Sequence, residues 1–276
     1  MLNFAELLKV IFLGIVEGIT EWLPISSTGH MLLVDEFLTL HMSESFKEMF
    51  FVVIQLGAIL AVVVLFWNKM FPFRFREKPV VQKDILLMWL KVAVSCIPAA
   101  ALGFLFDDFL EAHFGNAPTI ALMLIVYGVA FIVIEQWNKN RSPRVTEMEQ
   151  ISYPIALMVG LFQALSMIPG TSRSGATIVG ALLLGVSRPA AAEFTFFLAV
   201  PTMLGASLLK LVKFGFVFQA GEVIALLVGS AVAFLVSLAA IRFLMSYVRR
   251  HDFKLFGWYR IILGILVLLL FFGKNF

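Results

Sequence analysis

Six polar side chains that could carry chemistry lie in one short stretch, residues 14–31, of an otherwise apolar chain. The two glutamates of this stretch are four residues apart, so a helix places both carboxylates on one face. Carboxylates, hydroxyls and an imidazole can act as bases, nucleophiles, acids or metal ligands. Ionisable groups in so apolar a sequence mark a candidate functional site. The six residues are Glu17, Glu21, Ser26, Ser27, Thr28 and His30.

A proline divides this stretch into two helices. Pro24 lacks a backbone N–H and breaks the helical ladder, and the hydroxyls of residues 26–28 offer N-caps to a second helix beginning near Gly29. Ser27 and His30 are three apart and should lie on one side of its first turn. Other interpretations stay open: the glutamates could line the polar face of a surface-lying helix, the hydroxyls could be caps only, and His30 could be structural.

A second polar break occurs at residues 169–177, PGTSRSGAT. Arg173 lies there between Ser172 and Ser174, at the expected start of a helix. A guanidinium, two hydroxyls and the N–H groups of a helix N-terminus all favour phosphate oxygens. The competing interpretations are an arginine that reaches the membrane interface and serines that only cap the helix.

The composition is that of a membrane protein. Of 276 residues, 61% are hydrophobic and 14% charged, whereas soluble domains have about 45–50% apolar and about 25% charged residues. The mean hydropathy is +0.97, and long apolar runs favour helices over a barrel. The apolar start is not expected to be a cleaved signal peptide, because it lacks a basic region and carries glutamates. The single cysteine, Cys96, excludes an intrachain disulfide and a cysteine-based metal site.

The apolar segments predict six membrane-spanning helices and two shorter, interrupted segments. The helix expected over 26–40 would be about 22 Å long, short of the hydrocarbon core of about 30 Å, so the interrupted segments 2–40 and 151–186 are predicted to be re-entrant hairpins. An acidic loop is expected at 107–111, and the charges of Lys91, Glu135 and Arg260 are expected to snorkel or pair. The spans are predicted at 46–67, 85–106, 117–137, 193–215, 223–245 and 255–273.

The two halves of the chain form an internal repeat related by a shift of 146 positions. Each half, 1–137 and 151–273, contains one hairpin and three spans. Because three is odd, the second half must be inverted in the membrane relative to the first, an architecture in which broken helices meet near the midplane. The predicted fold is therefore an all-α polytopic membrane protein with an inverted-topology repeat. The matched pairs are Gly14 and Gly160, Glu17 and Gln163, Ser26 and Ser172, Ser27 and Arg173, Thr28 and Ser174, and Gly29 and Gly175.

The basic residues predict the orientation. Thirteen of the 21 lysines and arginines lie at 68–84, 138–150 and 242–254 or at Arg188, so these segments are assigned to the cytoplasm. Both termini and the acidic loop are then outside, and the first hairpin enters from the outer face. The net charge of +3 is small, and no nucleic-acid partner is expected. Nothing in the sequence indicates an oligomeric state.

If the two helix breaks face each other, the carboxylates and His30 of the first break lie against the guanidinium and hydroxyls of the second break. The cationic and hydroxyl groups would bind a phosphate, and the carboxylates and the histidine would supply acid–base or metal chemistry. Either Ser27 or a water molecule would be the nucleophile of a phosphoryl transfer. Because the site lies in the bilayer, the expected substrate is a lipid phosphate or diphosphate.

The motifs EGITEWLPISSTGH at 17–30 and PGTSRSGAT at 169–177 resemble the two signatures of the bacterial undecaprenyl-diphosphatase (bacitracin-resistance) family. The resemblance extends to IQLGAILAVVV at 54–64 and EFTFFLAVP at 193–201. It implies hydrolysis of undecaprenyl diphosphate to undecaprenyl phosphate and inorganic phosphate, which recycles the carrier lipid for peptidoglycan synthesis and gives bacitracin resistance. It also implies the bacterial plasma membrane, a site reached from the outer face, and a divalent cation, Mg²⁺ or Ca²⁺.

The functional positions carried over by motif match fall into the two breaks. Glu17 and Glu21 are also the candidate metal ligands, and the neighbouring hydroxyls complete the expected phosphate-binding set. Carried over are Glu17, Glu21, Ser27, His30 and Arg173; the hydroxyls are those of Ser26, Thr28, Ser172 and Ser174.

Two other classes of membrane protein share part of these features. A transporter or flippase for an anionic lipid or solute would also use inverted repeats and helix N-termini, and release of inorganic phosphate distinguishes the enzyme from it. The other lipid-phosphatase superfamily shares a faint likeness at SSTGH, but its basic K-x6-R-P motif is absent before Ser26 and Ile178 stands where its second histidine would be. That alternative is rejected.

Overall fold

The computed structural model describes residues 3–74, 79–215 and 217–272, and this part of the chain is built from helices without a named strand. Six of its helical segments are long and apolar enough to cross a membrane. This confirms the predicted all-α polytopic class with six spans. The candidate spans are Glu44–Leu65, Lys83–Phe106, Ala117–Asn138, Arg188–Phe214, Ala220–Val248 and Lys254–Phe271.

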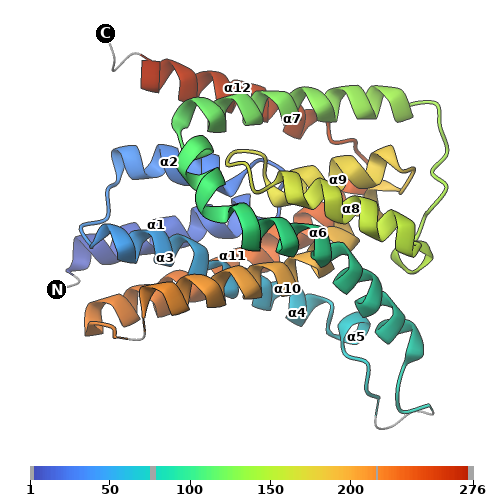
Figure 1. Cartoon of the computed structure of the whole chain (residues 1–276), viewed down its shortest axis with the longest axis horizontal. Helices are drawn as coiled ribbons and strands as arrows, with labels where there is room; N and C mark the ends of the chain where they lie inside the picture. Colours follow the sequence, from blue (N-terminus) through green and yellow to red (C-terminus); the bar gives the residue numbers. More distant parts are fainter. Residues whose placement is uncertain (1–2, 75–78, 216, 273–276) are drawn as a thin grey trace.

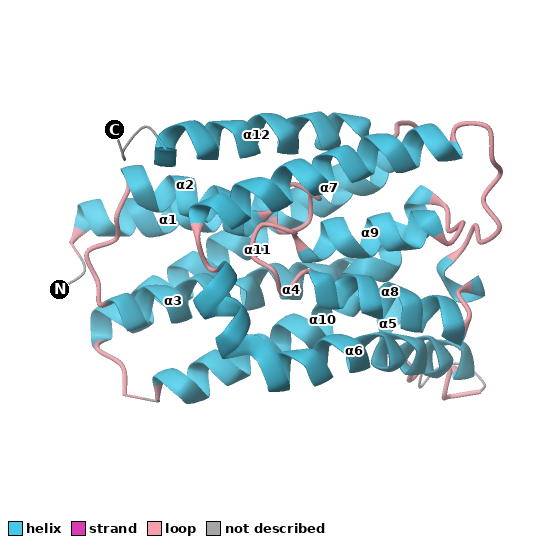
Figure 2. Cartoon of the chain, turned by 45° about the horizontal axis from the view of Figure 1, so that its top comes forward, coloured by secondary structure: helices cyan, strands magenta, loops and turns pink. Residues whose placement is uncertain are grey.

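The helices are arranged as one bundle with most axes roughly aligned (Figures 1 and 2). In chain order they are α1 Phe4–Thr20, α2 Ser27–Phe37, α3 Glu44–Val53, α4 Gln55–Leu65, α5 Trp67–Met70, α6 Lys83–Phe114, α7 Ala117–Asn138, the 3₁₀ helix η1 Met148–Gln150, α8 Tyr153–Leu165, α9 Arg173–Leu183, α10 Arg188–Phe214, α11 Ala220–Val248 and α12 Lys254–Phe272.

One predicted span contains an unexpected interruption, and one predicted loop is wrong. The span expected over 46–67 is divided at Ile54 into α3 and α4. The acidic segment 107–111 is not a loop, because α6 continues through it and ends at Phe114. Charge alone does not stop a helix; α6 ends where Gly115 and the N-cap Asn116 of α7 follow.

Both interrupted segments form a helix, a turn and a second helix, as predicted. The first is α1 and α2, and the second is α8 and α9. The second helix of the first pair begins two residues earlier than expected, because Ser26 is the N-cap and Ser27 is already helical. The structure is compatible with re-entrant insertion of both pairs, which stays a prediction.

The helices of the two halves pack in matching pairs. Helix α1 of the first half packs on α11 of the second, and α8 of the second half packs on α6 of the first. Helices α7 and α12 pack along each other through glycines: a Cβ on Gly128 would lie 2.7 Å from the carbonyl oxygen of Gly257, and a Cβ on Gly257 would lie 2.7 Å from that of Gly128. Such a reciprocal contact is what a two-fold relation between halves produces. The division into repeats at 1–137 and 151–273 remains a hypothesis that this pairing supports.

Candidate active site

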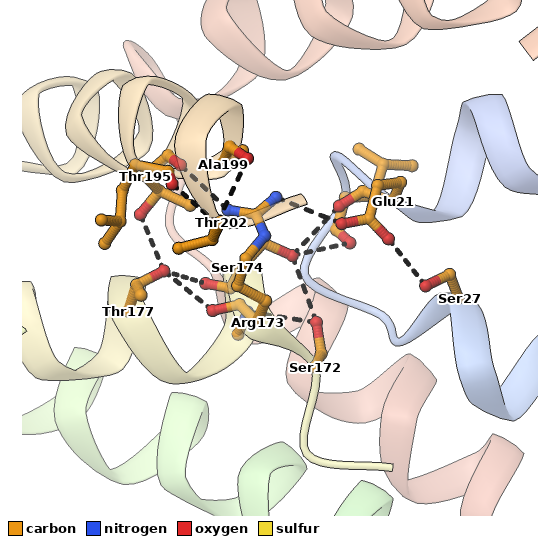
Figure 3. Close-up of polar contacts among 12 residues, drawn as sticks. Glu21, Ser27, Ser172, Arg173, Ser174, Thr177, Thr195, Ala199 and Thr202 are labelled. Carbon is orange, nitrogen blue, oxygen red and sulfur yellow. Dashed lines mark hydrogen bonds and ion pairs between the residues drawn. The ribbon is translucent and has the colours of Figure 1, made fainter. Parts of the chain in front are cut away.

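The two helix breaks lie against each other in the interior, although 146 positions separate their equivalent residues. Arg173 Nη2 lies 3.2 Å from Glu21 Oε1, and the two side chains are 11% and 8% exposed. The Ser174 hydroxyl donates to the carbonyl oxygens of Glu21 at 3.3 Å and Leu23 at 3.5 Å. Figure 3 shows these side chains converging from opposite sides. Arg173 is therefore an interior residue, and the membrane-interface interpretation of it is wrong.

The two breaks share the same backbone conformation at their N-cap serines. Ser26 and Ser172 have φ values of 72° and 71°, and they are the two non-glycine residues with positive φ in the described part of the chain. Each is the N-cap of the following helix, and its hydroxyl accepts from the N–H of Gly29 at 3.4 Å or Gly175 at 3.2 Å. A positive φ is uncommon for a side chain other than glycine and is found at functional sites. This conformation turns the chain, so that the next helix begins at Ser27 in the first break and at Arg173 in the second.

Ser27 is paired with Glu21. Its hydroxyl donates to Glu21 Oε2 at 2.8 Å, while Arg173 contacts the other oxygen of the same carboxylate. The three-residue spacing places His30 on the same side of the helix as Ser27, but the ring nitrogens of His30 contact Ser26 and Tyr259 instead. The resulting chain from Ser27 through Glu21 to Arg173 joins the two breaks in a single polar network (Figure 3).

His30 has a partner at each ring nitrogen. Its Nδ1 lies 2.7 Å from the carbonyl oxygen of Ser26, and its Nε2 lies 2.6 Å from the hydroxyl of Tyr259. A carbonyl oxygen only accepts, so Nδ1 carries the proton and Nε2 of the neutral ring accepts from Tyr259. This fixes both the orientation and the tautomer of the imidazole.

Several buried polar atoms around the breaks have no hydrogen-bond partner among the described residues. Glu17 is 1% exposed, and its Oε1 is one of these atoms. Buried polar groups are almost always satisfied, so each of these atoms is a candidate contact for an ion or a substrate. The others are Trp22 Nε1, both side-chain amide atoms of Gln163, Thr171 Oγ1 and Arg173 Nε.

The remaining predicted positions differ in their surroundings. Ser172 and Ser174 hydroxyls lie 3.1 Å apart beside Arg173, whose Nη1 also donates to the carbonyl oxygen of Thr195 at 2.9 Å. Thr28 is exposed on α2. Within the described residues no group of three or more histidine, cysteine or acidic side chains forms a metal site. Two carboxylates, Glu17 and Glu21, are therefore the acidic donors that the site offers.

Sequence reasoning missed two neighbouring residues of α12. Tyr259 contacts His30, and Arg260 is fully buried rather than snorkelling. No pattern in the sequence identified Tyr259; the position of Arg260 within an apolar span was the signal for the second. Glu135, by contrast, pairs with Arg188 at 2.5 Å, as expected.

Fold and site together define a class: a polytopic helical membrane protein in which two broken helix pairs meet, one carrying carboxylates and a serine hydroxyl, the other a guanidinium. Such a site suits an anionic, phosphate-bearing ligand.

The chain belongs to the family described as bacitracin resistance protein BacA, whose family model matches residues 10–266. It is 69% identical over 271 residues to an undecaprenyl-diphosphatase of Enterococcus faecalis, with 98% of each chain covered. It is 62% identical to an undecaprenyl-diphosphatase of Desulfitobacterium hafniense, again with 98% of each chain covered. A third relative of the same name, from Acetivibrio thermocellus, is 59% identical over 96% of this chain and 98% of its own.

Proposed function

We propose that this protein is an undecaprenyl-diphosphatase, which hydrolyses undecaprenyl diphosphate to undecaprenyl phosphate and inorganic phosphate in the membrane. Full-length relatives carry that name, and six apolar helices suit a lipid substrate. The observation that carries the assignment of roles is the Ser27–Glu21–Arg173 network, with distances of 2.8 Å and 3.2 Å. This network supports Ser27 as the nucleophile, Glu21 as the base and Arg173 as the phosphate-binding cation.

In the proposed reaction, Ser27 Oγ attacks the terminal phosphorus of the diphosphate and its proton passes to Glu21 Oε2. The bond between that phosphorus and the bridging oxygen breaks, and undecaprenyl phosphate leaves. Water then attacks the phosphoserine, releasing inorganic phosphate and returning the proton to Ser27. Direct attack by water, with Glu21 as its base, is the alternative that Ser27→Ala tests.

The phosphate would be bound by the second break. Arg173 has an unpartnered Nε in addition to its contact with Glu21, and Ser172 and Ser174 flank it. The N-termini of α2 and α9 add backbone N–H groups and a favourable dipole. His30, held by Ser26, presents Nε2 as the atom that can exchange a proton with a substrate oxygen when the Tyr259 hydroxyl yields its place.

A divalent cation, Mg²⁺ or Ca²⁺, fits the first break. The buried Glu17 Oε1, which has no hydrogen-bond partner among the described residues, would be one ligand of the cation. The Glu21 carboxylate would be the second. When bound, the cation would neutralise diphosphate charge and lower the pKa of a coordinated water. Glu17 would hold the cation, while Glu21 would keep its contact with Ser27.

The deciding experiment measures phosphate release from the C55 diphosphate lipid by detergent-purified protein, with and without EDTA. Wild type should release phosphate, and a trapped phosphoseryl species should be detectable. Ser27→Ala should lose far more than tenfold. A Ser27→Ala rate within about tenfold of wild type, a change of only about 1.4 kcal/mol in barrier, would exclude the covalent route.

A transporter or flippase is the second candidate, and the reciprocal pairing of the two halves favours it. A transporter that is not an enzyme releases no phosphate in detergent. Wild-type release that is abolished by Glu21→Gln would reject this candidate as the sole function.

We further place the protein in the bacterial plasma membrane, with the site reached from the outer face. In a Cys96→Ala background, an impermeant thiol reagent applied to intact cells should label Ala112→Cys, near the end of α6, and not Arg141→Cys, which lies beyond α7. The opposite pattern would reverse the orientation.

A further inference from the structure

Arg260 is a buried cation that contacts both breaks. Its side chain is 0% exposed, and within the described residues it forms no ion pair. Nη2 donates to the carbonyl oxygens of Gly170 at 2.9 Å and Thr171 at 2.8 Å. Nη1 donates to the carbonyl oxygen of Pro24 at 3.3 Å. One guanidinium thus bridges the turn after α1 and the turn after α8.

These carbonyl groups belong to residues that have left the helical ladder. A buried carbonyl oxygen left without a hydrogen-bond donor is destabilising, and Pro24, Gly170 and Thr171 are all buried. Arg260 also reaches α7 through longer contacts of 3.5 Å to the carbonyl oxygens of Met123 and Leu124. Arginine offers five N–H donors in a rigid fork, whereas lysine offers three from one atom. Only the fork can bridge the two turns in this way.

The bridged carbonyl groups stand next to the reacting groups. Pro24 precedes the cap Ser26 by two residues, and Thr171 precedes Arg173 by two. A shift of either turn relative to the other would change the 3.2 Å contact between Arg173 and Glu21 that joins the breaks. Tyr259, the residue before Arg260 in α12, contacts His30. Helix α12 therefore contacts the site through two neighbouring side chains.

We propose that Arg260 is a positioning residue, which holds the turns of the two helix pairs at the separation that phosphoryl transfer requires. The proposal rests on the diphosphatase function proposed above. Arg260 does not contact the reacting atoms; it acts on Glu21, Ser27 and Arg173 through the backbone of the turns. Misplacement of reacting groups by about 1 Å can lower a rate by about 10²-fold.

The first test is Arg260→Lys, with Arg188→Lys as the matched control at the Glu135 ion pair. In Arg260→Lys, kcat should fall at least about tenfold while KM stays within about threefold, because positioning acts on the transition state. Arg188→Lys should keep kcat within about twofold. Equal losses in both variants, or a loss that matches only the folded fraction, would show a merely structural arginine.

A second variant removes no polar group. A Cβ on Gly175 would lie 2.9 Å from Arg260 Nη1, so Gly175→Ala must displace the guanidinium, the flexible end of a long side chain. Gly205→Ala is the control, because a Cβ there meets nothing within 4 Å. Gly175→Ala should lower kcat at least about fivefold without loss of folding, and Gly205→Ala should not. Unchanged kcat in folded Gly175→Ala protein overturns the proposal.

A third measurement is independent of activity. Hydrogen–deuterium exchange should rise together in peptides covering 24–30 and 169–177 in Arg260→Lys, and in neither for Arg188→Lys, because the bridge protects both turns. Unchanged exchange at both turns contradicts the positioning role even if the lipid substrate proves to be different. Wild-type protein that releases no phosphate would instead refute the proposed function alone.

Discussion

The first and second breaks have nearly the same backbone and opposite charge. Each has a serine N-cap with φ near +71° that accepts from the glycine three residues on. At the next position the first break has Ser27 and the second has Arg173. Upstream, Glu17 is matched by Gln163. The same backbone geometry thus carries a serine hydroxyl and carboxylates in the first half and a guanidinium in the second, so that each half supplies groups that the other lacks.

The helices that follow the two breaks differ in burial. In α9 every residue from Ser174 to Leu182 is buried, whereas in α2 only Gly29 and Met31 are. Helix α9 is therefore part of the core, whereas α2 has the more accessible surface, although Glu17 and Glu21 before it are buried. This favours a substrate that enters along α2 and is held by α9.

The largest expected effect comes from removing the group that joins the two breaks. Glu21→Gln keeps the size of the side chain but weakens acceptance from Ser27 and Arg173 at once. Phosphate release should fall by at least about 10³-fold, against an unchanged rate in the exposed control Glu44→Gln. A loss below about tenfold would mean that the carboxylate is not the base.

The next effect tests the cationic break alone. Arg173→Lys keeps the charge but removes the planar fork, so binding of the phosphate through two parallel hydrogen bonds is lost. Activity should fall about 10²-fold, and Arg173→Ala further. Near-normal turnover of well-expressed Arg173→Lys protein would argue against phosphate binding by the guanidinium.

Glu17→Gln makes the first break match the second at that position. The amide is a poorer ligand than the carboxylate, so the Mg²⁺ or Ca²⁺ concentration for half-maximal activity should rise about 30-fold. Gln163→Asn is the control, and its metal dependence should not change. An unchanged metal requirement in Glu17→Gln would remove Glu17 from the proposed cation site.

The smallest effects compare two equivalent hydroxyls. Ser174 contacts the carbonyl oxygens of Glu21 and Leu23, whereas Thr28 is exposed. Ser174→Ala should lower activity about fivefold, the equivalent of about 1 kcal/mol for one buried hydrogen bond, and Thr28→Ala less than about twofold. The reverse order would place the phosphate nearer to α2 than to α9.

Much of the site could be predicted because its signals are local. A proline or glycine after a helical run, followed by serines, indicates a break and a cap from a few residues. The partner of Ser27 could not be predicted in this way. Glu21 lies in the turn after α1, and the positive φ of Ser26 decides whether Ser27 meets that carboxylate or the imidazole of His30. Helix periodicity does not extend across such a turn.

The sequence by itself determined the membrane class, the six spans, both breaks and the residue types they carry, because hydropathy, helix breakers and caps act over short distances along the chain. Only the tertiary structure decided that Glu21 joins Ser27 to Arg173, that α6 runs through its acidic segment, and that Arg260 and Tyr259 reach the breaks from α12. Those contacts link residues up to 236 positions apart. They depend on how whole helices pack, which no local pattern encodes.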